Sequence, residues 1–480
     1  MKKLNELFDV KEDIAIESIE EDSRVKADNY LFCAIEGLTV DGHNYIKQAV
    51  ENGAVAILAR KDVEASVPVI KVNDTNKAMS LALSKFYDNV DKQLKLIGVT
   101  GTDGKTTLSH IIYQLLNVLD NAAYIGTNGL ECKKYHRDQK FTTPFPKELY
   151  KYLSDFYDAG CNYVSIETTS ERLLANRLSE LDFEVAIFTN LSRDHLNTHK
   201  TMENYLLAKA KLFELVKDTG FSIINSDDKY AKEVIKRARG KVITYGIDSD
   251  ANVTAKDIMV TADQLTFTLI DNDNEYYIDS PLSGKFNVYN LMAAFITCTR
   301  LGYTPKMVID AIKLLKPISS RQTYVDCNQP YKVMIDYAHT ANALRNLLEY
   351  INITNRGRVI IVTGSGGLRD KGRRVEIGEA VTELADHVIF TLEDPRTEDV
   401  NDIIDDMVST IKDKRFNYER VLDREAAIFK ALSIADEGDI VLITGKGDED
   451  YQEINNQYVP YKTDYKVVEE YFKKEKLRCR

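Results

Sequence analysis

The stretch Lys95-Leu-Ile-Gly-Val-Thr-Gly-Thr-Asp-Gly-Lys-Thr-Thr107 decides the fold of this chain. Its first six residues form a short, mostly apolar strand, and a turn with two glycines follows. Residues 107–119 then repeat apolar side chains at helical spacing. A strand, a glycine turn and a helix in this order are typical of a phosphate-binding loop, because glycine lets backbone N–H groups point at phosphate oxygens.

Two side chains of this loop carry chemistry. Lys105 would reach the β- and γ-phosphates of ATP, and the Thr106 hydroxyl would bind Mg²⁺. The glycine usual five residues before Gly104 is missing, because Val99 stands there. A plain glycine turn at a helix start is the alternative, but the strand and helix on either side favour a nucleotide. The predicted ATP-binding residues of the loop are Gly101, Thr102, Asp103, Gly104, Lys105, Thr106 and Thr107.

Length and charge limit the function classes. The chain has 480 residues, which corresponds to about three domains at ~150 residues each. Its 63 basic and 75 acidic residues give a net charge of −12, which argues against a general binder of nucleic acid or anionic membranes. No apolar run is long enough to cross a bilayer, and the first residues lack an apolar signal region. We therefore expect a cytoplasmic protein without membrane insertion.

The six cysteines are scattered and form no Cys-x-x-Cys pair. Closely spaced pairs are typical of structural zinc sites, and dense, evenly numbered cysteines are typical of small disulfide-stabilised domains. We therefore expect neither structural zinc nor a disulfide framework.

Short apolar strands alternate with helical patterns along most of the chain. Strands are expected at residues 163–167, 185–190 and 221–225, with a helix at 204–216. This alternation predicts an α/β fold with parallel sheets and helices on both faces. Residues 252–280 alternate polar and apolar side chains instead, which predicts a small antiparallel excursion.

A second series of strands and helices begins at residue 332. It indicates a separate α/β unit at the C-terminal end. We therefore predict three α/β domains, covering residues 1–90, 91–316 and 317–480.

Polar residues follow the central strands, where open α/β sheets place their sites. Glu167 ends one strand, Asn190 ends the next, and His195 comes shortly afterwards. Glu167 and His195 could bind Mg²⁺, and Asn190 could bond the nucleotide. Taken alone, Asp194 and His195 would more often be a helix cap beside a surface histidine. Lys209 and Lys211 taken alone would be solvated lysines of an amphipathic helix.

Three stretches together resemble a known family. The loop at 101–106, Phe188-Thr-Asn-Leu-Ser-Arg-Asp-His-Leu196 and residues 205–213 are similar to the Mur ligases, the ATP-dependent amide-bond enzymes of peptidoglycan precursor synthesis. The resemblance covers nearly the whole chain. It is greatest to the members that add a diamino acid to UDP-N-acetylmuramoyl-L-alanyl-D-glutamate.

The resemblance implies an N-terminal UDP-substrate domain, a central P-loop ATPase-type domain and a C-terminal, doubly wound, Rossmann-like domain that binds the amino acid. In this family the lysine aligned with Lys209 carries a carbamate, an anionic oxygen donor that suits Mg²⁺. Lys211 lies about 200° further round the helix and would point elsewhere.

The roles implied by the resemblance fall into five groups. The catalytic residues would be Lys105, Glu167, His195, Lys209 and Arg321. The Mg²⁺ ligands would be Thr106, Glu167, His195 and carbamylated Lys209. Beyond the loop, ATP would contact Asn190, Asn287, Asn290, Arg321 and His339. The UDP-substrate contacts would be Ser23, Thr142, Thr143, Thr169, Ser170 and Arg177. The amino-acid contacts would be Glu393, Asp394, Arg396, Gly445 and Glu449.

The chain departs from the family pattern at several positions. Glu167-Thr-Thr-Ser-Glu171 stands where the family usually has Glu-Val-Ser-Ser-His. Gly445-Lys-Gly-Asp-Glu449 stands where Gly-Lys-Gly-His-Glu is usual, and only Arg321 is kept from the usual Gly-Arg-Met-Glu. These departures leave room for a related enzyme with a different acceptor.

The incoming amino acid is indicated by Glu393-Asp-Pro-Arg396, where diaminopimelate-adding members usually have Asp-Asn-Pro-Arg. Arg396 favours a distal carboxylate, because a guanidinium binds a carboxylate at two points. Asp394 adds negative charge, which favours an extra ammonium group. Diaminopimelate carries both groups, so meso-diaminopimelate is the favoured substrate, while L-lysine carries only the ammonium.

Other readings remain open at this point. The chain could add L-lysine, or it could be a paralogue with another amino acid or acceptor. From a different class, it could be a nucleotide-dependent protein that binds a cell-wall precursor without catalysis. In every case we expect ATP and Mg²⁺ as cofactors, small-molecule partners, no nucleic acid, and a monomer.

Overall fold

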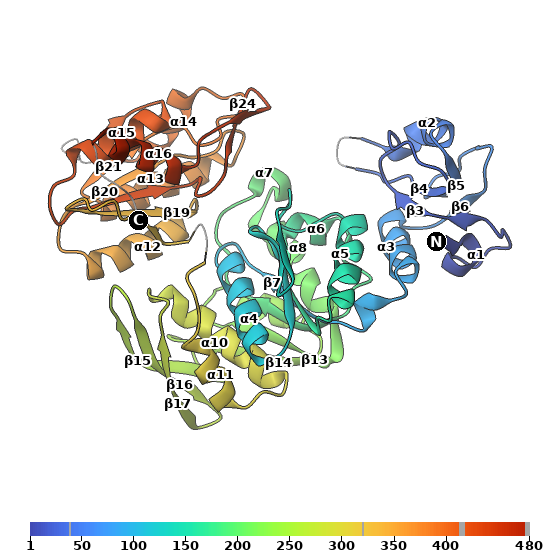
Figure 1. Ribbon diagram of the computed structural model, residues 1–480, viewed down its shortest axis with the longest axis horizontal. Helices are drawn as coiled ribbons and strands as arrows, with labels where there is room; N and C mark the ends of the chain where they lie inside the picture. Colours follow the sequence, from blue (N-terminus) through green and yellow to red (C-terminus); the bar gives the residue numbers. More distant parts are fainter. Residues whose placement is uncertain (38–39, 319–320, 412–417, 476–480) are drawn as a thin grey trace.

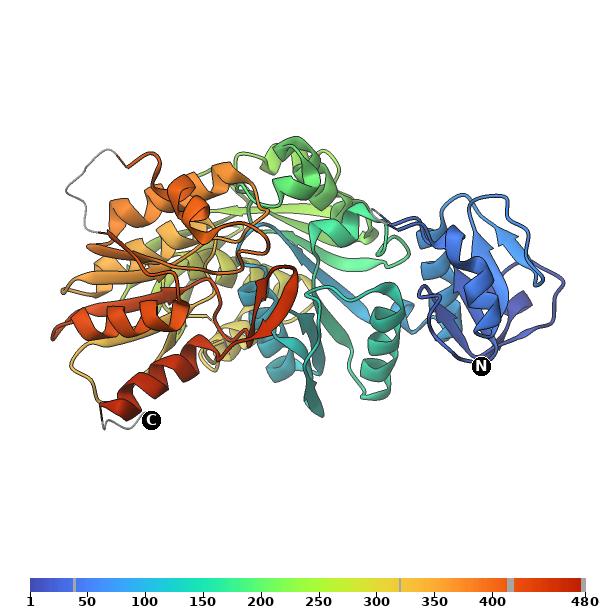
Figure 2. The same cartoon turned by 90° about the horizontal axis from the view of Figure 1, so that it is seen from above.

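The structure is a computed structural model that describes residues 1–37, 40–318, 321–411 and 418–475. Three large sheets define three domains along the chain. The first and third domains lie at opposite ends of the molecule, with the central domain between them (Figures 1 and 2). The predicted α/β fold with three domains is confirmed. The domain ends that we placed at residues 90 and 316 stay a prediction.

The central sheet has eleven strands in the described residues and is built around β7 (Lys95–Thr100). β11 (Tyr163–Glu167) and β12 (Phe183–Phe188) flank β7 on either side, and both pairings are parallel. The other parallel strands are β8 (Ala122–Gly126), β13 (Val216–Asn225), β14 (Lys241–Gly246) and β15 (Val253–Val260). The carboxyl ends of β7, β11 and β12 therefore meet at one edge of the sheet.

Both borders of the central sheet are antiparallel. β16 (Leu265–Asp271) and β17 (Asn274–Ser280) confirm the antiparallel excursion, which extends the central sheet instead of standing apart from it. On the other border, β9 (Gly129–Cys132) and β10 (Tyr135–Arg137) form a hairpin that we did not predict. Its strands are too short for a periodic signal.

Helices cover both faces of the central sheet. One face carries α4 (Lys105–Leu119), α10 (Phe286–Arg300) and α11 (Pro305–Ile312), and the other carries α5 (Pro146–Asp158) and α8 (Met202–Glu214). The shorter helices of this domain are α6 (Ser170–Leu174), α7 (Leu196–His199) and α9 (Ala231–Ile235).

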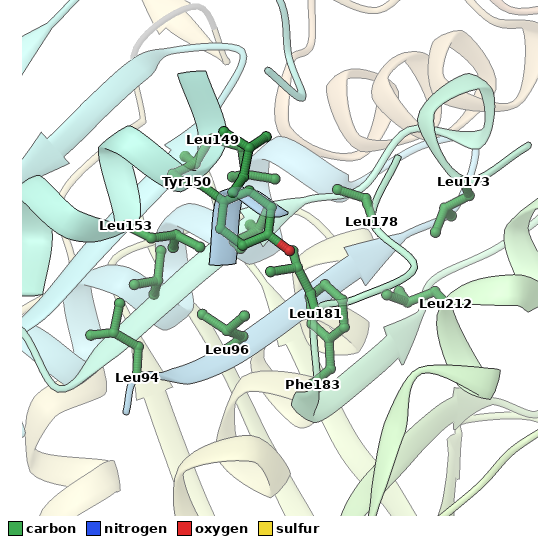
Figure 3. Packing of buried hydrophobic residues seen from close by; sticks show 14 of the residues in the cluster. Leu94, Leu96, Leu149, Tyr150, Leu153, Leu173, Leu178, Leu181, Phe183 and Leu212 are labelled. Atoms are coloured by element: carbon green, nitrogen blue, oxygen red, sulfur yellow. The ribbon is translucent and has the colours of Figure 1, made fainter. Parts of the chain in front are cut away.

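The core that packs against the start of β7 is apolar and closely packed. Leu149, Tyr150 and Leu153 of α5 lie over Leu96 of β7, with Phe183 of β12 beside them (Figure 3). All five side chains are fully buried. Since burying one large apolar side chain contributes about 1.5–3 kcal/mol, this cluster fixes β7 and the loop that follows it.

The third domain is doubly wound, as predicted. Its sheet runs β18 (Thr323–Tyr324), β19 (Lys332–Asp336), β23 (Ile440–Thr444), β20 (Val359–Thr363), β21 (His387–Phe390) and β22 (Tyr418–Arg420). All of its pairings except β18 with β19 are parallel. One face is covered by α12 (Ala341–Thr354), α13 (Lys371–Leu384) and α14 (Val400–Val408), the other by α15 (Arg424–Ile434) and α16 (Asp464–Lys474). A separate hairpin consists of β24 (Tyr451–Ile454) and β25 (Gln457–Pro460).

The first domain has a parallel sheet of β3 (Ser18–Glu20), β4 (Tyr30–Cys33), β5 (Ala54–Ala59) and β6 (Val69–Lys71). A two-stranded sheet of β1 (Lys2–Lys3) and β2 (Ala15–Ile16), with the helices α1 (Leu4–Leu7) and α2 (Ile46–Glu51), completes it. α3 (Thr75–Phe86) packs against α5 of the central domain (Figure 1). One hydrophobic cluster therefore runs through both domains.

Within the part of the chain that the structure describes, no helix is both long and apolar enough to cross a membrane. Cys33, Cys132, Cys161 and Cys298 are free and buried. Cys327 is disulfide-bonded, which the scattered cysteine spacing did not predict.

Candidate active site

A cleft of about 1860 Å³ is lined by side chains of the central and third domains. Most of the predicted site residues line it. From the central domain these are Thr102, Asp103, Gly104, Lys105, Thr106, Thr107, Thr142, Thr143, Glu167, Thr169, Ser170, Asn190, His195, Lys209, Asn287 and Asn290. From the third domain they are Arg321, His339, Glu393, Asp394, Arg396, Gly445 and Glu449. Gly101, Ser23 and Arg177 are not among the lining residues.

The phosphate loop holds Lys105 close to its own backbone. The Lys105 ammonium donates to the carbonyl oxygens of Gly101 at 3.0 Å and Thr102 at 2.8 Å. Gly104 precedes the helix with a φ of 83°, a left-handed conformation that favours glycine. Burial lowers the pKa of Lys105, although the charges of Glu167 and Asp103 oppose this shift.

Glu167, at the end of β11, is fully buried and held by four donors. Its carboxylate accepts hydrogen bonds from the hydroxyls of Thr106 at 2.9 Å, Thr127 at 3.2 Å and Tyr124, and from the Thr127 N–H at 2.9 Å. A Cβ on Gly126 would lie 2.1 Å from its Oε1 atom, so only glycine fits there. The carboxylate therefore has one fixed position beside the phosphate loop.

The oxygen atoms around Glu167 fit a hard divalent cation. One carboxylate and the Thr106 hydroxyl lie within hydrogen-bond distance of each other at the start of α4. Mg²⁺ prefers such oxygen ligands and keeps several waters. The described residues contain no group of three His, Cys, Asp or Glu that would hold a metal ion without other ligands.

The structure distinguishes Lys209 from Lys211. Lys209 is 1% exposed, and its ammonium donates to the Gly101 carbonyl at 2.6 Å and lies 4.5 Å from the Tyr205 ring centroid. Lys211 instead donates to the Leu174 carbonyl and to Asn176. Burial, with a contribution from the charge of Lys105, lowers the pKa of Lys209 well below its usual range. A larger fraction of neutral amine, the form that reacts with CO₂, follows from this shift.

His195 lies between two carboxylates. Its Nε2 atom is 3.3 Å from Asp194, and its Nδ1 atom is 3.7 Å from Glu171. The contact with His195 lowers the pKa of Glu171 to about 2, against the opposing effect of burial. Glu171, which stands where the family usually has histidine, therefore faces a predicted metal ligand.

Asn190 holds the phosphate loop. Its Oδ1 atom accepts the Asp103 N–H at 2.9 Å, and its Nδ2 group donates to the Asp103 carbonyl at 3.2 Å. The sequence suggested a bond to the nucleotide, which stays a prediction. The structure adds a contact between Asn190 and the loop backbone, which spacing alone could not indicate.

Residues of the third domain contact the phosphate loop directly. The Asp103 carboxylate accepts hydrogen bonds from the Thr340 hydroxyl at 2.7 Å and the Asn342 amide at 3.0 Å. Nearby, Arg373 lies 3.4 Å from Asp194, and both side chains are buried. Sequence reasoning missed these cross-domain residues, because nothing local in the sequence pairs positions so far apart.

A second group of residues lines the cleft beyond the loop. The Asn287 amide donates to the Ser283 carbonyl at 2.6 Å, and the Asn290 amide donates to Asn287 at 3.0 Å. The His339 Nδ1 atom lies 2.9 Å from the Tyr337 carbonyl oxygen. Burial and the nearby Arg373 charge lower the pKa of His339 to about 4, so its imidazole is neutral at neutral pH.

Arg321 lies on the third-domain side of the same region. Its guanidinium is 4.8 Å from the centre of the Tyr337 ring. Its charge opposes the rise that burial causes in the pKa of Asp336. Arg321 therefore brings positive charge to the same cleft as Lys105.

Predicted substrate contacts near Glu167 are interconnected. The Thr143 hydroxyl donates to the Glu167 carbonyl at 2.6 Å and accepts the Thr169 N–H at 3.0 Å. The Thr142 hydroxyl is 3.1 Å from that of Thr127, and the Ser170 hydroxyl is 2.9 Å from the His199 ring.

Ser23 and Arg177 lie outside this cleft, at the side of the first domain. The Ser23 hydroxyl donates to Gln48, and Arg177 is 3.5 Å from Glu21. Arg177 thus links the central and first domains. The roles predicted for both residues would require a ligand that reaches beyond the cleft.

At the amino-acid end of the cleft, the charged residues already have protein partners. Arg396 Nε lies 2.8 Å from the Glu453 carboxylate, and Asp394 lies 3.0 Å from the Lys446 ammonium. The sequence suggested that Asp394 adds negative charge, which favours a substrate ammonium group, and this role stays a prediction. The structure adds that Lys446, which also pairs with Glu449, is the protein partner of this carboxylate.

Two further carboxylates line this end. Glu393 is buried, its Oε2 atom has no hydrogen-bond partner among the described residues, and burial raises its pKa. A Cβ on Gly445 would lie 2.7 Å from that oxygen, so glycine leaves room for the carboxylate. Glu449 accepts a hydrogen bond from the Tyr337 hydroxyl at 2.9 Å.

Family models match three parts of the chain: the Mur ligase family catalytic domain over residues 15–87, the Mur ligase middle domain over 99–298 and the glutamate ligase domain over 320–447. A UDP-N-acetylmuramoyl-L-alanyl-D-glutamate–2,6-diaminopimelate ligase of Halalkalibacterium halodurans is 37% identical over 93% of this chain and 92% of its own length. The chain belongs to the Mur ligase family.

Other Mur ligases give the same picture. A protein of the same name from Clostridioides difficile is 38% identical over 92% of this chain and 91% of its own. A solved structure with that name has a TM-score of 0.70 at 30% identity and covers 99% of both chains. A MurF ligase of Thermotoga maritima in complex with ADP, 20% identical, covers 95% of this chain and 97% of its own with a TM-score of 0.65, which supports the fold alone.

Proposed function

We propose that this Mur ligase joins meso-diaminopimelate to UDP-N-acetylmuramoyl-L-alanyl-D-glutamate, driven by ATP, in peptidoglycan precursor synthesis. One observation carries the proposal: a single cleft contains the phosphate loop with Lys105, the Glu167 carboxylate, the buried Lys209 and, from the third domain, Arg396. The names of relatives that match more than nine-tenths of the chain support the choice of substrates.

The reaction proceeds in two steps. The γ-phosphate of ATP moves to the D-glutamate side-chain carboxylate, which gives an acyl phosphate and ADP. The amine of the incoming amino acid then attacks the acyl carbon, phosphate leaves, and an amide bond forms. The acyl phosphate is an activated form of the carboxylate, because phosphate is a good leaving group when the amine attacks.

Lys105 binds the phosphates during the first step. Its present partners are two neutral carbonyl oxygens, so a phosphate oxygen replaces them readily. The loop N–H groups and Arg321 add positive charge around the transferring group. Together they stabilise the charge that develops in the transition state.

The donors around Glu167 fit Mg²⁺, so Thr106 and Glu167 would hold one ion, and His195 with carbamylated Lys209 would add ligands. When bound, Mg²⁺ neutralises charge on the transferring phosphoryl group. Tyr124 and Thr127 keep the Glu167 carboxylate in place. The neutral amine favoured at Lys209 supports carbamate formation.

The third domain completes the site. Its Thr340 and Asn342 side chains hold Asp103 of the loop, and its Arg396 lines the far end of the cleft. The amino acid binds to the third domain, and the acyl phosphate forms on the central domain. Closure of the third domain onto the central domain therefore brings the two reactants together. Exclusion of water by the closed cleft protects the acyl phosphate from hydrolysis.

Two alternative functions can be compared with the structure. An L-lysine-adding enzyme, or one with another amino acid or acceptor, is favoured by the Arg396–Glu453 pair, which occupies the expected carboxylate clamp. A precursor-binding protein without catalysis is disfavoured by Lys105, Glu167, His195 and Lys209, since pure binding requires no such set. We further expect a cytoplasmic monomer with small-molecule partners.

The test is phosphate release from ATP with the muramoyl dipeptide and a panel of diamino acids. Release that requires both substrates, with a product mass that matches the tripeptide, is the expected result. Release without an amino acid, or no release with any, would contradict ligase activity. Omission and readdition of Mg²⁺ tests the metal requirement in the same assay.

A further inference from the structure

Arg396 is already engaged with the protein itself. Its Nε group faces the Glu453 carboxylate at 2.8 Å, and its Nη1 group donates to the Gly367 carbonyl at 2.5 Å. The side chains of Arg396 and Glu453 are 18% and 22% exposed, so the pair is partly shielded from water. Ion pairs in such positions are stronger than those on an open surface.

Main-chain hydrogen bonds hold the two residues together. The Arg396 N–H donates to the Glu453 carbonyl at 2.9 Å, and the Asn455 N–H donates to the Arg396 carbonyl at 2.5 Å. The Glu453 N–H also donates to the Asp394 carboxylate at 2.9 Å. The hairpin of β24 and β25 is thus fixed against residues 394–396, and the Glu453 side chain starts beside Arg396.

The cations of this end of the cleft lie among carboxyl groups, and Arg369 and Arg373 line the cleft as well. Among residues 393–453, the lining side chains include two cations, Arg396 and Lys446, and five carboxyl groups, Glu393, Asp394, Asp448, Glu449 and Glu453. Lys446 forms ion pairs with both Asp394 and Glu449. A second carboxylate brought in by a substrate must therefore compete with protein carboxylates that are already paired with Arg396 and Lys446.

We propose that Glu453 is a specificity-determining residue, because its carboxylate occupies the edge of Arg396 that the distal carboxylate of a diamino dicarboxylic acid needs. The inference rests on the proposed function and deepens it. A guanidinium binds a carboxylate at two points through neighbouring N–H groups. The Nη1 group of Arg396 is held by the Gly367 carbonyl, a main-chain group that cannot swing away. The substrate carboxylate must therefore bind at the Nε edge, and Glu453 has to leave that edge first.

The substrate must therefore displace one carboxylate with another. This exchange weakens the binding of diaminopimelate. L-Lysine has no distal carboxylate, so it binds without breaking the Arg396–Glu453 pair. Glu453 thus reduces the difference in affinity of the enzyme for diaminopimelate and for L-lysine. It acts on the affinity for the amino acid and not on phosphoryl transfer, which takes place at the phosphate loop.

The experiment measures KM and kcat of the full chain for meso-diaminopimelate and L-lysine, with wild type, Glu453→Gln and Glu425→Gln. Glutamine keeps the length of the side chain and removes its charge. We expect Glu453→Gln to lower the KM for diaminopimelate about 3- to 10-fold, with kcat and the KM for lysine changed less than about twofold. Glu425 is the matched control, since it lies on α15 and does not line the cleft.

A double-variant comparison separates competition from a structural effect. In an Arg396→Ala background, Glu453→Gln should no longer change the KM for diaminopimelate, because the contested group is gone. An equal change for both amino acids, no change, or the same change without Arg396 would overturn the inference. A wild-type protein that ligates neither amino acid would instead refute the proposed function on which the inference rests. If wild type ligates only diaminopimelate, the change in the KM for diaminopimelate between wild type and Glu453→Gln, with and without Arg396, decides whether the inference holds.

Discussion

The two ends of the cleft hold their cations in different ways. At the phosphate end, Lys105 and Lys209 both donate to the carbonyl oxygen of Gly101. At the amino-acid end, Arg396 and Lys446 form ion pairs with Glu453 and Asp394. Neutral acceptors bind a cation weakly, so the lysines are ready for phosphate or for carbamate formation, whereas the amino-acid end exchanges one ion pair for another.

The difference suggests a division of tasks. The phosphate end directly follows β7, and the start of β7 packs in the apolar core with α5 and β12 (Figure 3). This anchoring keeps the geometry that phosphoryl transfer needs. The amino-acid end consists of a loop and a hairpin at the edge of the third domain. Substitutions at the phosphate end should therefore lower the rate with every substrate, and substitutions at the amino-acid end should change the choice between substrates.

The largest effect is expected for Lys105→Ala. ATP turnover should fall at least about 10³-fold, because the lysine is the loop cation that meets the phosphates. The fold should persist, since Lys105 bonds only two loop carbonyls. Phosphate release and circular dichroism measure the two outcomes. An unfolded variant would mean that the loop lysine is structural.

Lys209→Ala should lower activity about 10²-fold with both amino acids, and added acetate should restore part of it. A small carboxylate can replace the lost carbamate in the space that the alanine leaves. Lys211→Ala is the matched control on the same helix, because Lys211 bonds Leu174 and Asn176 instead of the loop. Full activity of Lys209→Ala would remove this residue from the site.

Arg396→Lys should act on selectivity. A lysine cannot reproduce the planar two-point contact, and losing such a charge-assisted pair costs about 2–3 kcal/mol, or roughly 30- to 150-fold. We expect kcat/KM for diaminopimelate to fall by this factor relative to that for lysine. If wild type prefers lysine and the variant changes neither value, Arg396 is no carboxylate clamp.

The smallest effect concerns the stability of the phosphate end. Burial lowers the pKa of His199, whose ring lies 2.9 Å from Ser170 and stacks on Tyr205, to about 4 from an ordinary 6.5. Between these values the unfolded chain binds more protons than the folded one, so the free energy of unfolding falls as pH drops from 6.5 towards 4.

This contribution should amount to about 1–2 kcal/mol. His199→Gln keeps a polar side chain and removes the titration, so its stability should change less between pH 7 and pH 5 in urea unfolding. Identical pH dependence in variant and wild type would mean that His199 is protonated equally in both states.

Local spacing predicted much of the fold. The strand at 95–100, the phosphate loop and the helix after it lie in the expected order, because glycine turns and helical periodicity are properties of neighbouring residues. Helical spacing also separated Lys209 from Lys211, which the structure places on different neighbours. The β9–β10 hairpin escaped prediction because its strands are too short to show a period.

The sequence by itself determined the α/β fold and its three domains, and most of the site residues that the family resemblance implied do line the cleft. Only the tertiary structure decided their partners: Asn190 with the loop backbone, Asp103 with Thr340, and Arg396 with Glu453. Backbone propensity and periodicity act between residues close in sequence, whereas an ion pair depends on which distant segments the packed sheets bring within a few ångströms. The type of reaction and the favoured amino acid could therefore be predicted from motifs, whereas the pairing of Arg396 with Glu453 could not.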